Sequence, residues 1–238
     1  MARSSYQARY RTRYPEKDRD TFMELEVYLA GAVSAPSSGT ISVWDGSNSK
    51  LIDGAAVTVT NSIANYTLLA SALTAASYSA GWRFEWSLVM DDGSTRVFRE
   101  VGSLVRVEPI APVSDPDLEA HLPDLSRYLA QGDTSWQKYV LEAVDFIFDR
   151  LESEGRRPYL IVGWRGIRAV VLFQVLANVC LFLAGTGEED NAWWRRYEVY
   201  TGKLEAAWAS MTLVYDADDD GDPPTDSRVS GSPSVWLA

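Results

Sequence analysis

The chain has 238 residues, of which 46% are hydrophobic and 23% charged, and its formal net charge is −11. This composition is typical of a globular protein and excludes an intrinsically disordered one, while the negative charge argues against nucleic acid as a partner of the whole surface. The length fits either one large core or two domains of ordinary size.

Residues 1–20 carry six basic and three acidic groups and include the aromatic-rich segment RSSYQARYRTRYPEKDR. We find no helical or strand period in them. We interpret residues 1–20 as a basic N-terminal arm that is either flexible or docked on an acidic neighbour, such as another copy of the chain. Contact with nucleic acid is a further alternative. The first residues lack the apolar core of a signal peptide, so secretion by that route is not expected.

Residues 21–110 show the period of β-strands. Apolar and polar residues alternate, as in half-buried strands, at positions 23–29, 40–44, 56–60, 82–89 and 103–109. Asp92-Gly93 is a hairpin turn signal, and the segment 67–81 is ambiguous between strand and short helix. Six or seven short strands separated by turn-forming segments predict an antiparallel β-sandwich of immunoglobulin-like architecture over residues 21–110.

The period changes to that of helices after the proline-rich stretch 108–117, where we place a domain boundary. We expect a short helix followed by three longer ones, at positions 122–129, 134–154, 164–185 and about 190–212. Because short loops join them, neighbouring helices are expected to be antiparallel. Residues 113–214 are therefore predicted to form a small helical bundle, and the chain as a whole an α+β protein of two domains.

The helix predicted at 134–154 has an uninterrupted amphipathic stripe and clear boundary signals. Thr134 and Gln137 fit a capping box, and Gly155 is a natural helix end. In the helix at about 190–212 the residues expected to face the core are Trp194, Tyr197, Thr201, Leu204, Trp208 and Met211.

The helix predicted at 164–185 is apolar enough to raise the question of a membrane span, because its run reaches the lower limit of length for crossing a bilayer. Arg168, Gln174 and Asn178 interrupt the run, so we expect a helix buried by neighbouring helices instead. Cys180, the sole cysteine, lies within it and is expected to act as a small apolar residue.

The segment YDADDDGDPP opens an acidic C-terminal tail, residues 215–238. Asp216, Asp218 and Asp220 occupy the first three ligand positions of a calcium loop, but Ser227 stands where a bidentate Glu belongs and two prolines prevent the return into a helix. The segment is thus either a weak, partial Ca²⁺ site formed by these three aspartates or a solvated acidic tail directed at basic groups on a partner.

Signals for catalysis are sparse. His121 is the only histidine, and the sequence contains no nucleophile elbow, phosphate loop or dinucleotide fingerprint. A lone histidine in this context is expected to be a surface or capping residue. We therefore predict that the protein is not an enzyme and needs no cofactor apart from the Ca²⁺ alternative.

Residues 114–222 contain, in order, a short helix, an amphipathic helix, the segment GRRPYLIVGWRGIRAVVLFQVLANVCLFLAG and a Trp- and Tyr-rich helix running into LVYDADDDGD. This pattern resembles the head–tail connector (adaptor, or head-completion) proteins of tailed bacteriophages. The resemblance implies a structural virion protein of the neck, at the head–tail junction, assembled in the host cytoplasm. It also implies a ring of about twelve subunits, a dodecamer, on the portal protein.

Such a ring would extend the DNA channel toward a stopper or tail-terminator protein, with DNA passing through it without sequence-specific binding and with no membrane involved. The family's C-terminal segments reach into the portal, so the resemblance implies docking residues in the tail: Tyr215, Asp216, Asp218, Asp220, Val235, Trp236 and Leu237. The predicted sandwich is a departure from the compact members of this family, and we expect it on the outside of the ring.

Two other functional classes remain as alternatives to a phage connector protein. One is a binding or adhesion module, with the sandwich as recognition surface, a helical oligomerisation domain and Ca²⁺ at the aspartates. The other is an enzyme with a polar pocket around His121 or a carboxylate pair.

Overall fold

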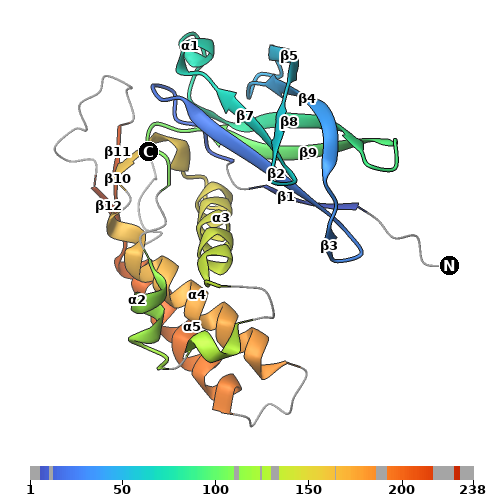
Figure 1. Cartoon of the computed structure of the whole chain (residues 1–238). Coiled ribbons are helices and arrows are strands. Elements are labelled where there is room, and N and C mark those ends of the chain that lie inside the picture. Colours follow the sequence, from blue (N-terminus) through green and yellow to red (C-terminus); the bar gives the residue numbers. More distant parts are fainter. Residues whose placement is uncertain are drawn as a thin grey trace. The chain divides into compact units, whose positions relative to one another are not determined.

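The computed structural model describes residues 6–10, 13–109, 113–123, 125–129, 134–163, 165–185, 192–216 and 228–230. The chain is a mixed α+β protein, with antiparallel sheets in its N-terminal part and helices in its C-terminal part (Figure 1). It divides into two compact units, Met1–Glu108 and Pro109–Ala238. The division falls at the start of the proline-rich stretch 108–117.

The N-terminal unit contains two antiparallel sheets. The first has the order β1-β2-β7-β6 with β3 also paired to β2, and its strands are β1 Tyr6–Tyr10, β2 Thr21–Leu29, β3 Ala32–Val33, β6 Thr58–Thr60 and β7 Ile63–Leu68. The second has the order β5-β4-β8-β9, formed by β4 Pro36–Trp44, β5 Lys50–Ala56, β8 Ser79–Met90 and β9 Thr95–Leu104. The short helix α1, Ala70–Leu73, connects β7 to β8.

Both sheets contribute side chains to one apolar core. Strand β8 buries every second residue, namely Trp82, Phe84, Trp86, Leu88 and Met90, and β2 does the same with Met23, Leu25 and Val27. This is the alternation that the sequence predicts, because successive side chains of a strand point to opposite faces. Asp92 and Gly93 form the turn of the β8–β9 hairpin, as predicted.

The interpretation of residues 1–20 as an arm without a strand period is wrong for part of that stretch. Tyr6–Tyr10 is strand β1, which pairs antiparallel with β2, and the Tyr10 hydroxyl donates to the carbonyl of Arg99 at 2.9 Å. Tyr6, Ala8 and Tyr10 alternate with Gln7 and Arg9 and pack against the core, so a strand period is present but spans only five residues.

Two of the predicted strands also differ in their bounds from those in the structure. The segment 56–60 is divided at Val57, whose N–H donates to the carbonyl of Gly39 at 3.1 Å. The segment 103–109 is not a separate strand, because β9 ends at Leu104. The ambiguous segment 67–81 contains the end of β7, helix α1 and the start of β8.

The C-terminal unit contains three long helices and a small sheet. Its helical elements are α2 Asp115–Glu119, α3 Gln137–Ser153, α4 Arg168–Ala184, α5 Ala192–Ser210 and the 3₁₀ turns η1 Leu125–Tyr128, η2 Pro158–Leu160 and η3 Arg165–Ile167. Helix α4 packs against both α3 and α5 (Figure 1). The sheet has the order β10-β11-β12, formed by Ile161–Gly163, Thr212–Tyr215 and Arg228–Ser230.

Helix α4 is buried along most of its length, as predicted. The polar side chains of Gln174 and Asn178 satisfy each other, since the Gln174 Nε2 donates to the Asn178 Oδ1 at 2.8 Å. Cys180 is a buried free thiol. Within the described part of the chain, no helix is both long and apolar enough to span a bilayer.

Helix α3 begins later than predicted, because Thr134 does not cap it. The helix starts after Trp136, and its first N–H groups are served by Ser135, whose Oγ accepts from the N–H of Gln137 at 3.0 Å. A capping box is instead present at Ser114, before α2. The short helix predicted at 122–129 is reduced to the 3₁₀ turn η1.

The aromatic stripe of α5 is only partly core. Leu204, Trp208 and Met211 are buried, as predicted, but Tyr200 is buried in place of Tyr197.

Candidate functional site

The C-terminal tail leaves the helical unit from a three-stranded sheet that the sequence did not predict. Tyr215, at the end of β11, pairs with Ile161 of β10, and the N–H of Asp216 donates to the carbonyl of Leu160 at 3.1 Å. On the other side of β11, Leu213 pairs with Val229 of β12. The start of the tail is therefore fixed by backbone pairing on the β10 side, and a later part of the tail, β12, pairs with the other side of β11.

Tyr215 and Asp216 are both buried, with exposed fractions of 9% and 0%. The sequence predicts both as docking residues at the start of the C-terminal tail. Because they are buried, they anchor the tail to the helical unit and offer little surface to a partner. We call Tyr215 and Asp216 the anchor of the tail. The remaining predicted docking residues, Asp218, Asp220, Val235, Trp236 and Leu237, lie outside the described residues.

The end of α3 brings a guanidinium to this anchor. Gly155 has φ 76° and donates to the carbonyl of Glu152 at 2.9 Å, while Arg156 donates to that of Leu151 at 3.0 Å. This pair of bonds is a Schellman motif, which confirms the predicted helix end at Gly155. The turn directs the next residue, Arg156, back toward the sheet.

An ion-pair network connects α3 and α5 beside the anchor. Arg150 of α3 binds both carboxylate oxygens of Glu205 of α5 at 3.1 Å, and its guanidinium lies 4.0 Å from the ring centroid of Trp208. Glu154 accepts from the Trp208 Nε1 at 3.0 Å and pairs with the Arg156 Nε at 3.3 Å. We call Arg150, Glu154, Arg156, Glu205, Trp208 and Tyr215 the tail-root cluster.

The charges of the cluster shift the pKa values of its members. Hydrogen bonding to Glu205 raises the pKa of Arg150, and the same bond lowers that of Glu205. Burial raises the pKa of the Tyr215 phenol to about 12, an effect that the positive charge of Arg156 partly offsets. At neutral pH the cluster thus holds three ion pairs, Arg150–Glu205, Arg150–Glu154 and Arg156–Glu154, beside a neutral phenol.

The Tyr215 Oη and the Arg156 Nη1 are both buried. The guanidinium of Arg156 lies close enough to the phenol to act on it both as a positive charge and as a hydrogen-bonding neighbour. The two groups thus provide each other's polar surroundings, as expected for buried polar atoms.

No metal-binding constellation is present in the described part of the chain. The described residues contain no group of three or more His, Cys, Asp and Glu side chains placed to hold a metal ion. Of the three aspartates proposed for Ca²⁺, only Asp216 is described, and it is buried at the end of β11. His121 is exposed and stands edge-to-face with the rings of Phe173 and Tyr200, at centroid distances of 6.0 and 6.4 Å.

Sequence reasoning located the start of the tail but missed the cluster around it. Gly155 was the one indication of this cluster in the sequence, because a helix that ends there places the next side chain, Arg156, near a neighbouring element. The sequence matches no known family model and no curated protein.

The high pKa of Tyr215 predicts a loss of stability in alkali. Between about pH 10 and pH 12 the unfolded chain releases this phenol proton while the folded chain retains it, so the unfolded state is increasingly favoured. A pKa difference of this size corresponds to about 2–3 kcal/mol.

Urea unfolding of the wild type and of Tyr215→Phe, at neutral pH and at about pH 11, would measure this effect. The variant should lose less stability between the two conditions. The stability of the variant should still depend on pH in this range, since burial also raises the pKa of Cys180, to about 11. Equal losses in both proteins would show that Tyr215 titrates normally.

Proposed function

We propose that this protein is a head–tail connector subunit of a tailed bacteriophage, a structural virion protein that forms a ring on the portal and extends the DNA channel toward the tail. The proposal starts from the resemblance of residues 114–222 and is supported by the surface of the helical unit. The order of the helices and the position of the acidic segment, which follows the last helix after strand β11, agree with it.

The observation that carries the proposal is a set of large apolar side chains exposed on three helices. Phe146 of α3, Phe182 of α4 and Val199 of α5 have exposed fractions of 48%, 53% and 55%, and Leu181 beside Phe182 has 42%. A ring subunit needs two different apolar surfaces, one for each neighbour, because the contact is head-to-tail. Exposed residues on several helices supply such surfaces.

The tail-root cluster supports a second part of the proposal, in which the tail docks on the portal. Backbone pairing and burial fix the chain as far as Asp216, and pairing with β11 fixes it again at Arg228–Ser230, so the chain has defined positions on both sides of the acidic segment. A fixed starting point reduces the entropy that the tail loses when it binds. The aspartates after it would meet basic groups of the partner.

We propose further that the N-terminal unit is an immunoglobulin-like sandwich and the C-terminal unit a helical bundle. The strand orders β1-β2-β7-β6 and β5-β4-β8-β9 correspond to the orders A-B-E-D and C′-C-F-G of the immunoglobulin fold when β3 is left aside. The packing of α4 on both α3 and α5 supports the bundle.

Ring assembly is tested by placing a charge on the exposed helical surface. Phe182→Asp should weaken self-association by about tenfold or more, because a carboxylate buried in an apolar contact is not compensated. Analytical ultracentrifugation and electron microscopy of the protein, alone and with the portal protein encoded in the same genome, would measure assembly.

Val101→Asp is the matched control, because Val101 of β9 is 65% exposed and lies in the other unit. It should leave the rings intact. A wild-type protein that remains monomeric with and without the portal protein would contradict the proposal, and so would equal loss of rings in both variants.

A further inference from the structure

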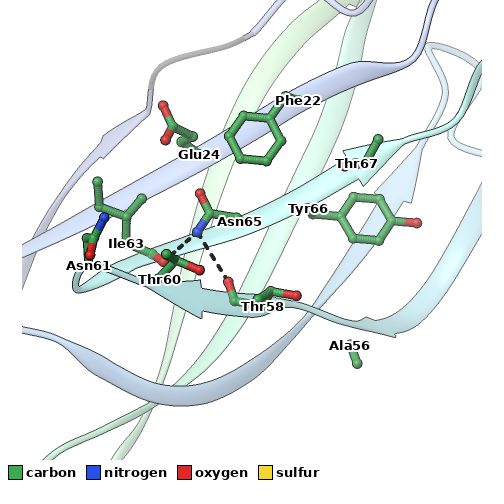
Figure 2. A pocket seen from close by; sticks show the side chains of 10 residues that line it. All are labelled: Phe22, Glu24, Ala56, Thr58, Thr60, Asn61, Ile63, Asn65, Tyr66 and Thr67. Carbon is green, nitrogen blue, oxygen red and sulfur yellow. Dashed lines mark hydrogen bonds between the residues drawn. The ribbon is translucent and has the colours of Figure 1, made fainter.

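A shallow pocket of about 480 Å³ in the N-terminal unit is formed by the strands of the first sheet (Figure 2). Its lining includes Phe22 of β2 and Thr67 of β7. The Nδ2 of Asn65 donates to the carbonyls of Ile63 at 2.8 Å and Thr58 at 3.4 Å, so both amide hydrogens are engaged within the β6–β7 hairpin. This polar group of the lining thus serves the sheet. By contrast, large apolar side chains of helices α3 and α5 lie largely outside the core of the helical unit.

Helix α3 has an apolar residue between two acidic ones on its exposed face. Glu142, Phe146 and Asp149 are all exposed and follow one another at steps of four and three residues, so they lie on one side of the helix. The buried residues of α3 lie on the other side. Tyr139, two turns before Phe146, continues the exposed side, and its ring centroid lies 6.2 Å from that of Phe182 of α4. We call Glu142, Phe146 and Asp149 the acidic face of α3.

Helix α5 has an apolar residue between two basic ones on its own exposed face. Arg196, Val199 and Lys203 are exposed and follow one another at steps of three and four residues, so they share one side. The Arg196 guanidinium lies 4.7 Å from the ring centroid of Trp193, and the Lys203 Nζ lies 5.3 Å from that of Tyr200. These rings hold the two cations in place without neutralising their charge. We call Arg196, Val199 and Lys203 the basic face of α5.

The two faces match in spacing as well as in charge when the helices lie antiparallel. In each face the charged residues are seven positions apart, which is about 10 Å along the helix axis. The apolar residue follows the first charge by four positions in α3 and by three in α5, so reversing one helix aligns the two apolar residues with each other. The opposed pairs are then Glu142–Lys203, Phe146–Val199 and Asp149–Arg196.

The two faces belong to different surfaces of one subunit, so they can meet only between copies. Helix α4 packs against both α3 and α5, and the two outer helices turn their buried side chains toward the core of the helical unit. A contact of α3 in one copy with α5 in the next is head-to-tail. It leaves one face of each copy free for a further copy, as a ring requires.

We propose that the acidic face of α3 docks antiparallel on the basic face of α5 of a second copy of the chain. The inference rests on the proposed connector function, because it names the two surfaces that meet in the ring. Phe146 and Val199 form the apolar centre of the contact, and the four charges surround it. The charges also select the partner, since either face docked on itself would bring like charges together.

Exchanging one opposed pair of charges tests this contact. Glu142→Lys and Lys203→Glu should each weaken self-association by about tenfold or more, because each places two like charges in opposition. The double variant with both changes should recover most of the wild-type affinity, since opposite charges face each other again. Both positions are exposed, so the circular dichroism spectrum should not change. Analytical ultracentrifugation of the full chain, alone and with the portal protein encoded in the same genome, would measure association.

Asp91→Lys combined with Lys203→Glu is the matched control. Asp91 is an exposed residue at the β8–β9 turn of the other unit, so this variant has the net charge of the exchanged pair but should not recover association. The inference would be overturned by wild-type chains that stay monomeric under both conditions or by single variants that associate like the wild type. An exchanged pair that stays impaired, or equal recovery in both double variants, would also overturn it.

The same measurements separate this inference from the proposed function. Rings on the portal protein that the single variants leave unchanged would support the connector function and overturn the α3–α5 contact. Recovery by charge exchange without any ring on the portal protein would support the contact and contradict the connector function.

Discussion

Replacing Gly166 by alanine is expected to destabilise the C-terminal unit by about 1–3 kcal/mol and to loosen strand β11. A Cβ atom at this position would collide with the backbone carbonyl of Thr212, the first residue of β11. Neither group is the end of a flexible side chain, so the 3₁₀ turn η3 and β11 would have to separate. Urea unfolding followed by circular dichroism would measure the loss of stability, and hydrogen exchange at Leu213 and Tyr215 would locate it.

Gly202 provides the matched control for this change. It lies exposed within α5, and a Cβ atom there would meet nothing within 4 Å. Gly202→Ala should therefore stabilise the protein by about 0.5–1 kcal/mol, since alanine loses less conformational freedom than glycine in a helix. The two glycine substitutions should thus act in opposite directions, and a neutral or stabilising Gly166→Ala would show that β11 is not held against η3.

Under the proposed function, Gly166→Ala should also impair attachment to the portal. The anchor of the tail, from Tyr215 to Asp216, follows β11 directly, so a displaced β11 changes the point from which the tail leaves. Loss of portal binding with rings preserved would separate the role of the tail from that of the helical surface.

The parts of the fold that local pattern determines could be predicted from the sequence. The strict alternation in β2 and β8 reflects one buried and one exposed face, and the stripe of α3 reflects a helix packed on one side. Gly155 marked the end of α3 because a left-handed residue is needed there. In each case the information lies within a few neighbouring residues.

The parts that depend on distant partners could not be predicted. Strand β1 alternates over only five residues, too few to be distinguished without its partner β2, while β10 and β12 have only three residues each. The capping box assigned to Thr134 failed for the same reason. The Oδ1 of Asp115, which belongs to α2, accepts from the N–H of Trp136 at 3.1 Å and competes for the start of α3.

The candidate site shows the same division. The sequence identified the acidic tail and its first residues, because five aspartates in seven positions are visible at once. It could not show that Asp216 is buried, that Arg156 and Glu154 lie beside Tyr215, or that Trp208 donates to Glu154, since these contacts join the end of α3 to β11 and α5. The pocket at Phe22 and Thr67 likewise depends on the register between β2 and β7.

A substitution in the core of the N-terminal unit is expected to have the second large effect on stability. Trp86 is 1% exposed in β8, so Trp86→Ala should lower the free energy of unfolding of this unit by about 3–5 kcal/mol, through lost burial and the cavity left behind. The long helices α3, α4 and α5 belong to the other compact unit, so their circular dichroism signal should persist when the N-terminal unit unfolds. Simultaneous loss of both signals would show that the two units unfold as one.

A comparison of Trp86→Phe with Trp82→Phe separates burial from hydrogen bonding. Both tryptophans are buried in β8, but the Trp82 Nε1 donates to the Ser79 Oγ at 3.0 Å, whereas that of Trp86 has no acceptor among the described residues. Phenylalanine removes the indole N–H in each case. Trp82→Phe loses a hydrogen bond and Trp86→Phe loses none, so Trp82→Phe should be the more destabilising by about 1 kcal/mol in urea unfolding. If Trp86→Phe is equally or more damaging, the Trp86 indole has a polar partner and the two positions are equivalent.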